Sequence, residues 1–241
     1  MKNLLLHKIR LTHYLVIIFA LFIVTFLFLP SYEFSGATLT LFSVNSFLYG
    51  FYISPIISGQ KARIDELHKV IRAEANALFS IQIKLKNLPQ HLRSEMQQKV
   101  IDYTNTKLRG KKSNSGESQY EDLIGYCLEY KGEHKEDVSK VLDLLVANQQ
   151  NRTQFTMQMS NKVYSNEWLI MAILFSITLS VIMLMDVQGM FILTIVKALL
   201  CTALTMLMII LLKLSTLSHK KAREVWTPFT KLLKTHFYQI D

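Results

Sequence analysis

The sequence predicts an all-α membrane protein, in which four transmembrane helices form two hairpins with a helical cytoplasmic domain between them. The chain has 241 residues, of which 50% are hydrophobic. Its apolar residues are concentrated in four stretches, each close to the roughly 20 residues that a helix needs to span a bilayer. The links between the first and second stretches and between the third and fourth are short, as in antiparallel helix pairs.

Four regions follow from this pattern. The N-terminal flank and first hairpin occupy residues 1–58, with spans at about 11–29 and 37–58. The cytoplasmic domain covers residues 59–167. The second hairpin covers residues 168–212, with spans at about 168–185 and 190–212, and residues 213–241 form a basic amphipathic tail.

The first span, "LTHYLVIIFALFIVTFLFL", follows basic residues, as the core of a secretory signal peptide does. Its apolar run is longer than the roughly 7 to 15 residues of a signal-peptide core, and no cleavage site of small residues follows it. We therefore expect a transmembrane helix that is retained in the protein.

Lysine and arginine flank the spans on one side only. The outer links, "PSYEFSG" and "DVQG", contain the acidic residues Glu33 and Asp186 and no basic residue. The basic flanking residues are Lys2, Lys8, Arg10, Lys61, Arg63, Lys69, Arg72, Lys213, Lys220, Lys221 and Arg223. Because cytoplasmic flanks are rich in lysine and arginine, we predict a multi-pass protein of the cytoplasmic (inner) membrane with both termini in the cytoplasm. The same rule accounts for the net charge of +9 without a nucleic-acid partner.

The cytoplasmic domain is predicted to be a helical bundle. Apolar residues in steps of three and four from Ile64 to Ile81 indicate an amphipathic helix that continues span two. Pro89 opens a second helix that ends near Leu108, because proline suits the first helical turn. The remaining elements are a polar loop over residues 109–119, a short helix over 120–130 and a helix over 135–166. We expect this last helix to enter span three without a break.

No pattern in the sequence indicates an enzyme. A glycine-rich phosphate loop and a nucleophile elbow are both missing, and the seven histidines are scattered without metal-ligand spacing. We therefore expect no catalytic residue, no cofactor and no metal site. Cys127 lies in a polar region and Cys201 lies in span four, so we expect no disulfide between them.

Span two carries two stripes of residues that predict different contacts. Small residues at every fourth position permit close helix packing in lipid. These small residues are Ser46, Gly50, Ser54 and Ser58. The second stripe mixes polar and aromatic side chains in steps of three and four, and consists of Thr38, Phe42, Asn45, Tyr49 and Tyr52. It is a candidate pore lining, where hydrophobic rings gate a channel by dewetting; alternatively, Asn45 and the tyrosines form hydrogen bonds within the helix bundle.

Span four, "MFILTIVKALLCTALTMLMIILL", contains one charged residue, Lys197. In the predicted orientation it lies roughly 10 Å below the outer boundary. Three interpretations remain open. The ammonium group reaches the outer headgroups, because helical side chains tilt toward the N-terminus; it attracts anions into a water-filled vestibule; or it pairs with Asp186 or Glu33.

The tail contains a segment, "KKAREVWTPFTKLLKTHFYQI", with apolar residues near one face and lysines elsewhere. The apolar residues are Val225, Phe229, Leu232, Leu233 and Phe237. This pattern predicts either a helix that lies on the anionic inner leaflet or a helix packed on the cytoplasmic bundle. Pro228 is expected at the start of that helix.

Several short motifs resemble a known family. They are Glu74-Ala75 within "RAEANAL", Leu88-Pro89, Tyr103, and Arg152 before span three. From about residue 40 to residue 212, the chain resembles the bacterial bestrophin-like membrane proteins, which are relatives of the bestrophins. Bestrophins are pentameric anion channels whose second helix lines the pore. The resemblance implies a homo-oligomer in the lipid bilayer, a pentamer if bestrophin-like, that conducts chloride-type anions through a pore lined by span two.

The chain also departs from the bestrophin pattern. No acidic cluster corresponds to the calcium clasp of bestrophins, and "SGQKARIDEL" stands in place of their aromatic-rich segment after the second span. The alternative function is a non-conducting membrane interaction or signalling protein, whose cytoplasmic helices dock a partner.

Overall fold

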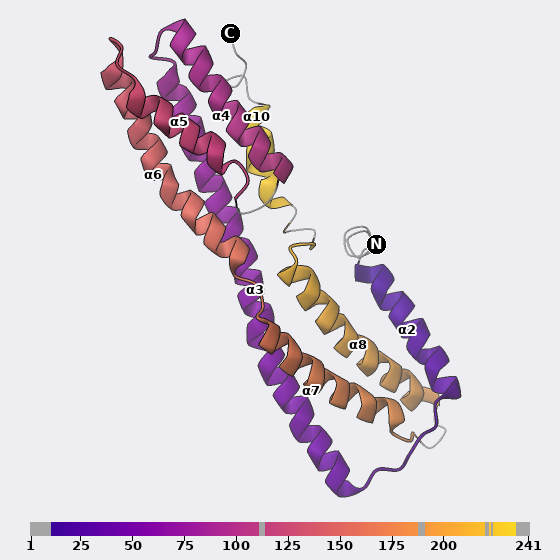
Figure 1. The fold of residues 1–241 in the computed structure, drawn as a ribbon. Coiled ribbons are helices and arrows are strands. Elements are labelled where there is room, and N and C mark those ends of the chain that lie inside the picture. The colour runs from indigo at the N-terminus through magenta and orange to yellow at the C-terminus, as the bar shows by residue number, and fades with distance from the viewer. Residues whose placement is uncertain (1–10, 111–113, 188–190, 220–221, 223, 235–241) are drawn as a thin grey trace. The chain divides into compact units, whose positions relative to one another are not determined.

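A computed structural model describes residues 11–110, 114–187, 191–219, 222 and 224–234 (Figure 1). Within these ranges every regular element is a helix, which confirms the all-α prediction. The helices are α2 (Leu11–Phe28), α3 (Gly36–Leu85), α4 (Gln90–Gly110), α5 (Glu117–Glu129), α6 (Lys135–Ser160), α7 (Ser165–Leu184), α8 (Phe191–Ser215), the 3-10 helix η1 (Glu224–Trp226) and α10 (Thr227–Leu233).

Four of the described helices contain stretches long and apolar enough to cross a membrane. They are α2, the first part of α3, α7 and α8. Large apolar side chains on their outer surfaces are exposed, for example Leu27 and Phe28 of α2 and Phe191 of α8. Such extensive exposed apolar surface is unfavourable in water and suits a lipid environment. The chain is therefore a membrane protein.

Helix α3 runs unbroken from Gly36 to Leu85, as predicted. The expected unbroken helix from residue 135 into span three is wrong, because α6 ends at Ser160 and α7 begins at Ser165. The backbone N–H of Tyr164 donates to Oε2 of Glu167 at 2.9 Å. This bond caps the first turn of α7, and it favours a new helix start where periodicity alone suggested continuity.

The loop predicted over residues 109–119 is shorter in the structure, because α4 reaches Gly110 and α5 begins at Glu117. Gly116 precedes α5 with a φ of 84°, a left-handed conformation that glycine adopts without steric cost. A Cβ atom at Gly116 would lie 2.9 Å from Cδ2 of Tyr103. Glycine therefore lets the start of α5 approach α4 closely.

The chain forms two compact units. Unit 1 consists of Met1–Ala62 and Lys162–Ala222, and unit 2 consists of Arg63–Asn161 and Arg223–Asp241. Within unit 1, α8 packs against both α2 and α7. One hydrophobic cluster contains Phe22, Ile182, Ala198 and Cys201. A second contains Tyr49, Ile53, Val163, Met171 and Leu211.

The two short links of unit 1 meet each other. The backbone N–H of Tyr32 donates to the carbonyl of Leu184 at 2.8 Å, and that of Asp186 donates to the carbonyl of Tyr32 at 3.0 Å. Tyr32 and Met185 thereby form an isolated parallel bridge. The link after α2 and the link after α7 therefore lie at the same end of unit 1.

Within unit 2, α4 packs against α5, α5 packs against α6, and α10 packs against α4. The tail segment begins with η1 and α10, with Pro228 in the first turn of α10 as predicted. Val225, Phe229 and Leu232 are buried, so the described part of the tail packs on the helical bundle. The other tail residues named from the sequence, Lys220, Lys221, Arg223 and Phe237, lie outside the described residues, as do Lys2, Lys8, Arg10 and the predicted start of span four at residue 190.

Replacing Gly116 with alanine should lower the free energy of unfolding by roughly 1 to 2 kcal/mol, because the left-handed backbone is costly for L residues and the methyl group would meet Tyr103. The matched control is Gly125→Ala in α5, where a Cβ atom would have no neighbour within 4 Å. Alanine favours a helix interior over glycine by about 0.8–1 kcal/mol. Thermal unfolding followed by circular dichroism compares the two variants, and equal midpoints would contradict the role of Gly116.

Candidate functional site

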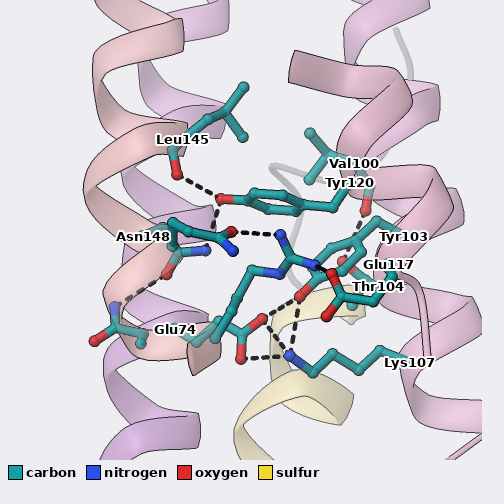
Figure 2. A network of polar contacts seen from close by, with 12 residues as sticks. Glu74, Val100, Tyr103, Thr104, Lys107, Glu117, Tyr120, Leu145 and Asn148 are labelled. Atoms are coloured by element: carbon teal, nitrogen blue, oxygen red, sulfur yellow. Dashed lines mark hydrogen bonds and ion pairs between the residues drawn. The ribbon is translucent and has the colours of Figure 1, made fainter. Parts of the chain in front are cut away.

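Unit 2 encloses a network of charged and aromatic side chains contributed by four helices (Figure 2). Each residue lies on the inward-facing stripe of its helix, at positions three or four residues from buried apolar neighbours. The network consists of Glu74 from α3, Tyr103 and Lys107 from α4, Glu117 and Tyr120 from α5, and Asn148 and Arg152 from α6.

The carboxylate of Glu74 is fully buried and receives bonds from two side chains of α4. The Tyr103 hydroxyl donates to Oε1 of Glu74. The Lys107 ammonium donates to Oε1 at 2.5 Å and to Oε2 at 2.6 Å, and it also donates to the Tyr103 hydroxyl at 2.9 Å. A buried ion pair is tolerated only when its geometry is good and its remaining polar atoms are satisfied, and this arrangement meets that requirement.

Aromatic rings surround the Lys107 ammonium. Its Nζ lies 4.6 Å from the ring centre of Phe155, 5.4 Å from that of Tyr103 and 5.6 Å from that of Phe229, within the range of cation–π attraction. Burial lowers the pKa of Lys107, and the Glu74 carboxylate opposes that change. Burial raises the pKa of Tyr103 well above its ordinary value, and Glu74 adds to the rise, so the phenol stays protonated and keeps its donor.

Arg152 forms the second half of the network. Its guanidinium donates to Oε2 of Glu117 and, at 2.6 Å, to Oε1 of Gln149. Its Cζ atom lies 3.7 Å from the centre of the Tyr120 ring. Asn148 contacts the same tyrosine, since its Nδ2 donates to the Tyr120 hydroxyl at 3.1 Å.

The Tyr120 hydroxyl in turn donates to the carbonyl of Leu145 at 2.8 Å. Burial raises the pKa of Tyr120 to about 12. The neutral phenol therefore persists at physiological pH as a hydrogen-bond bridge between α5 and α6.

This network holds α3, α4, α5 and α6 of unit 2 together through buried ion pairs and hydrogen bonds. Its two carboxylates each face a cation, and no group of metal-ligating residues occurs among the described residues. Of its members, the sequence motifs had pointed to Glu74, Tyr103 and Arg152, which the structure brings together. Sequence reasoning missed Lys107, although it lies four residues after Tyr103 and hence on the same helix face.

Removing one partner of the buried pair should cost more stability than removing both. Glu74→Gln leaves the Lys107 ammonium without its carboxylate and should destabilise the protein by about 3–5 kcal/mol, whereas the double variant Glu74→Leu with Lys107→Met should lose much less. Thermal unfolding of the single and double variants tests this. The exposed pair Lys69–Glu66, at 3.2 Å, is the control, since Glu66→Gln should change stability by about 1 kcal/mol or less. Additive losses at Glu74 and Lys107 would contradict the coupling.

The predicted pore-lining stripe of span two makes contacts inside the single chain. Nδ2 of Asn45 donates to Oγ1 of Thr178 at 2.7 Å and to the carbonyl of Leu174 at 3.1 Å, both on α7. Tyr49 is buried in a hydrophobic cluster of unit 1, and Tyr52 packs beside it. Phe42 packs beside the other cluster, and Thr38 pairs its hydroxyl with that of Ser35 at 3.1 Å.

The small-residue stripe of span two lies on the other side of α3. Gly50, Ser54 and Ser58 are exposed, and Ser46 is partly buried. A Cβ atom at Gly50 would have nothing within 4 Å. Gly50, Ser54 and Ser58 therefore face outward, whereas the Ser46 hydroxyl is enclosed. Close helix packing through the stripe remains a prediction.

Lys197 is buried in unit 1, with 8% of the residue exposed. Its Nζ donates to the carbonyl of Met185 at 2.8 Å and lies 4.5 Å from the ring centre of Phe26. The contact partners are a carbonyl at the end of α7 and an aromatic ring, and the side chain reaches them because it tilts toward the N-terminus of α8. An anion vestibule at Lys197 remains a prediction.

The contact between Asn45 and Thr178 should stabilise unit 1 by about 0.6 kcal/mol, the average for hydrogen bonds between membrane helices, and by no more than about 1.7 kcal/mol. A double-mutant cycle of Asn45→Ala and Thr178→Val, read by thermal unfolding in nanodiscs, measures this coupling. Thr25 supplies the control, because its hydroxyl bonds only the carbonyl of Leu21 in its own helix, and Thr25→Val should not couple to Asn45→Ala. A coupling near zero for Thr178 would show that the amide does not hold α3 to α7.

Comparison with known proteins supports the resemblance seen in the short motifs. The family description "Bestrophin-like domain" matches residues 30–230. This range begins in the link after α2 and ends within α10, so it includes the whole polar network. No curated protein matches the chain, and no solved structure does. Because the match covers most of the sequence, the chain belongs to the bestrophin-like family.

Proposed function

We propose that this protein is an oligomeric anion channel, without enzymatic activity, in which copies of α3 surround a chloride-type pore. The observation that carries the proposal is the bestrophin-like domain over residues 30–230. Bestrophins conduct anions through a pore lined by their second helix, and α3 is the second apolar helix of this chain.

The exposed side of α3 supports an assembly of several copies. Gly50, Ser54 and Ser58 on this side are small and exposed, so copies of α3 can converge closely around a common axis. Phe47 and Phe51 are also exposed, with ring centres 6.1 Å apart. Asn45 and Tyr49 contact other parts of unit 1. In the proposed channel, the exposed side of α3 therefore lines most of the pore.

The proposal includes the two-hairpin arrangement in the inner membrane, with both termini in the cytoplasm. The bridge between Tyr32 and Met185 supports it, because it brings the two acidic links to the same end of unit 1. Basic flanks belong on the cytoplasmic side, so the acidic links face outward.

The alternative is a non-conducting membrane protein whose cytoplasmic helices dock a partner. One observation favours it: the polar stripe that would line a pore is used for contacts with α7. A protein of this kind needs no central axis, and a monomer or dimer is sufficient.

Two measurements on the full chain separate these functions. Native mass spectrometry in nanodiscs should give a closed ring, a pentamer if the assembly is bestrophin-like, and purified protein in liposomes should release trapped chloride. Ser54→Trp on the exposed side of α3 should remove most of the flux by filling the pore. The matched control is Leu21→Trp, an exposed position on α2 that the proposal places against lipid, which should leave the flux unchanged.

Lys197→Met tests the anion-vestibule prediction in the same assay, with reduced flux as the expected result. A ring without flux would favour the docking function, and a monomer would exclude a pore between subunits.

A further inference from the structure

Two hydroxyl groups of α3 lie inside unit 1 without a hydrogen-bond partner among the described residues. They are Oγ of Ser46 and the phenolic oxygen of Tyr49, and protein atoms enclose both of them. Only 2% of the surface of Tyr49 is exposed. A buried hydroxyl without a hydrogen bond is unfavourable, because it has lost its bonds to water and gained none. Two such groups one helical turn apart indicate a bound partner that the described residues do not supply.

Ser46 differs from the threonines of the apolar helices. In α2, α3, α7 and α8, threonine hydroxyls donate to the carbonyl four residues earlier, which satisfies them within their own helix. These threonines are Thr25, Thr40, Thr178, Thr202 and Thr205. Ser46 does not form this bond, so its hydroxyl remains available to another group.

Tyr49 differs in the same way from the buried tyrosines of unit 2. Tyr103 and Tyr120 each donate their hydroxyl to an acceptor of the protein. The Tyr49 ring packs beside α7, with its centre 6.3 Å from that of the Phe175 ring. Phenylalanine would give the same packing, whereas the hydroxyl of a buried tyrosine normally has a hydrogen-bond partner. The phenolic oxygen of Tyr49 therefore needs a partner of its own.

The two hydroxyls belong to the inward side of α3. Residues three apart are neighbours on a helix surface, and helical side chains lean toward the N-terminus, so Tyr49 leans over the turn that contains Ser46. Asn45 on that turn donates to Thr178 of α7. The hydroxyls thus lie where α3 is packed inside unit 1, and not on the outward side that carries Gly50.

The chemistry of the site favours a small hydrogen-bond acceptor. Each hydroxyl can donate one hydrogen bond, so the two can donate to the same atom. A hard metal cation needs about six oxygen ligands, commonly carboxylates. Residues 36–64 of α3 contain no carboxylate, α7 has none after Glu167, and α8 has none. A water molecule, in contrast, needs only about two to four polar partners, and a halide ion also accepts hydrogen bonds from hydroxyls.

We propose that Ser46 and Tyr49 together bind one small hydrogen-bond acceptor inside unit 1, either a water molecule or a chloride-type anion. The bound acceptor satisfies both hydroxyls, one turn from the direct contact between Asn45 and Thr178. The site lies within a single chain. It therefore depends neither on the proposed channel activity nor on an oligomer.

Removing each hydroxyl tests whether it is bonded. Tyr49→Phe and Ser46→Ala should each lower the midpoint of thermal unfolding of the full chain in nanodiscs. The double variant should lose less than the sum of the two, because both hydroxyls bind one ligand. If the hydroxyls were unpaired, either substitution would remove a buried unsatisfied atom and leave the midpoint unchanged or raise it. That result, or strictly additive losses, would overturn the proposal.

Two substitutions on the same helix are matched controls. Tyr52→Phe changes a partly buried tyrosine, and Ser43→Ala changes an exposed serine, and neither hydroxyl is enclosed without a partner. Both controls should shift the midpoint less than the corresponding change at Tyr49 or Ser46. Equal losses at the control positions would assign the effect to general packing and overturn the site.

The salt in the buffer distinguishes the two ligands. The unfolding midpoint is measured in sodium chloride and in sodium gluconate at the same ionic strength, because gluconate is too large for an enclosed site. A chloride ligand predicts a higher midpoint in chloride for the unmodified protein and no such difference for Tyr49→Phe. Equal salt effects in both proteins, including none at all, identify water, provided that the loss caused by Tyr49→Phe is present in both salts.

A cryo-EM map of the full chain in nanodiscs tests the site directly. Density for a single atom is expected within hydrogen-bond distance of both the Ser46 and the Tyr49 hydroxyl oxygens. A well-resolved map without this density, or with a direct hydrogen bond between the two hydroxyls, would overturn the proposal.

Discussion

The packing of the helices in unit 2 depends on one buried carboxylate, that of Glu74, which requires hydrogen-bond donors from the protein. Glu74 has no surface exposed to solvent, and a charge removed from water is tolerated only with donors from the protein itself. Tyr103 and Lys107 supply those donors from α4, and Phe229 of α10 lies over the Lys107 ammonium. Because the partners come from different elements, satisfying this charge fixes the register of α4 and α10 on α3.

The two faces of α6 differ in charge. Arg152 points inward, where Glu117 and the Tyr120 ring neutralise and cover it. The outward face is left without charge over the same turns. The interior network and the neutral outward face are therefore two sides of the same segment.

In unit 1 the polar side chains need hydrogen-bond partners within the protein, because lipid offers none. Asn45 donates to Thr178 and to a backbone carbonyl, and Lys197 donates to the carbonyl of Met185. These two polar groups each have a partner on another element of the same unit. The exposed side of α3 has few such groups, and it suits contact with lipid or with a second copy.

The sequence by itself determined the helical class, the four apolar helices and the continuous α3, because apolar periodicity and span length are properties of local sequence. The family followed from a resemblance in short motifs. It also pointed to Glu74, Tyr103 and Arg152 through short motifs. Only the tertiary structure decided that these three residues meet with Lys107 and Glu117, that α6 and α7 are separate helices, and that Asn45 faces α7. The physical reason is that these outcomes depend on partners distant in the chain: a hydrogen bond or a buried ion pair has a definite position only when both helices are in place.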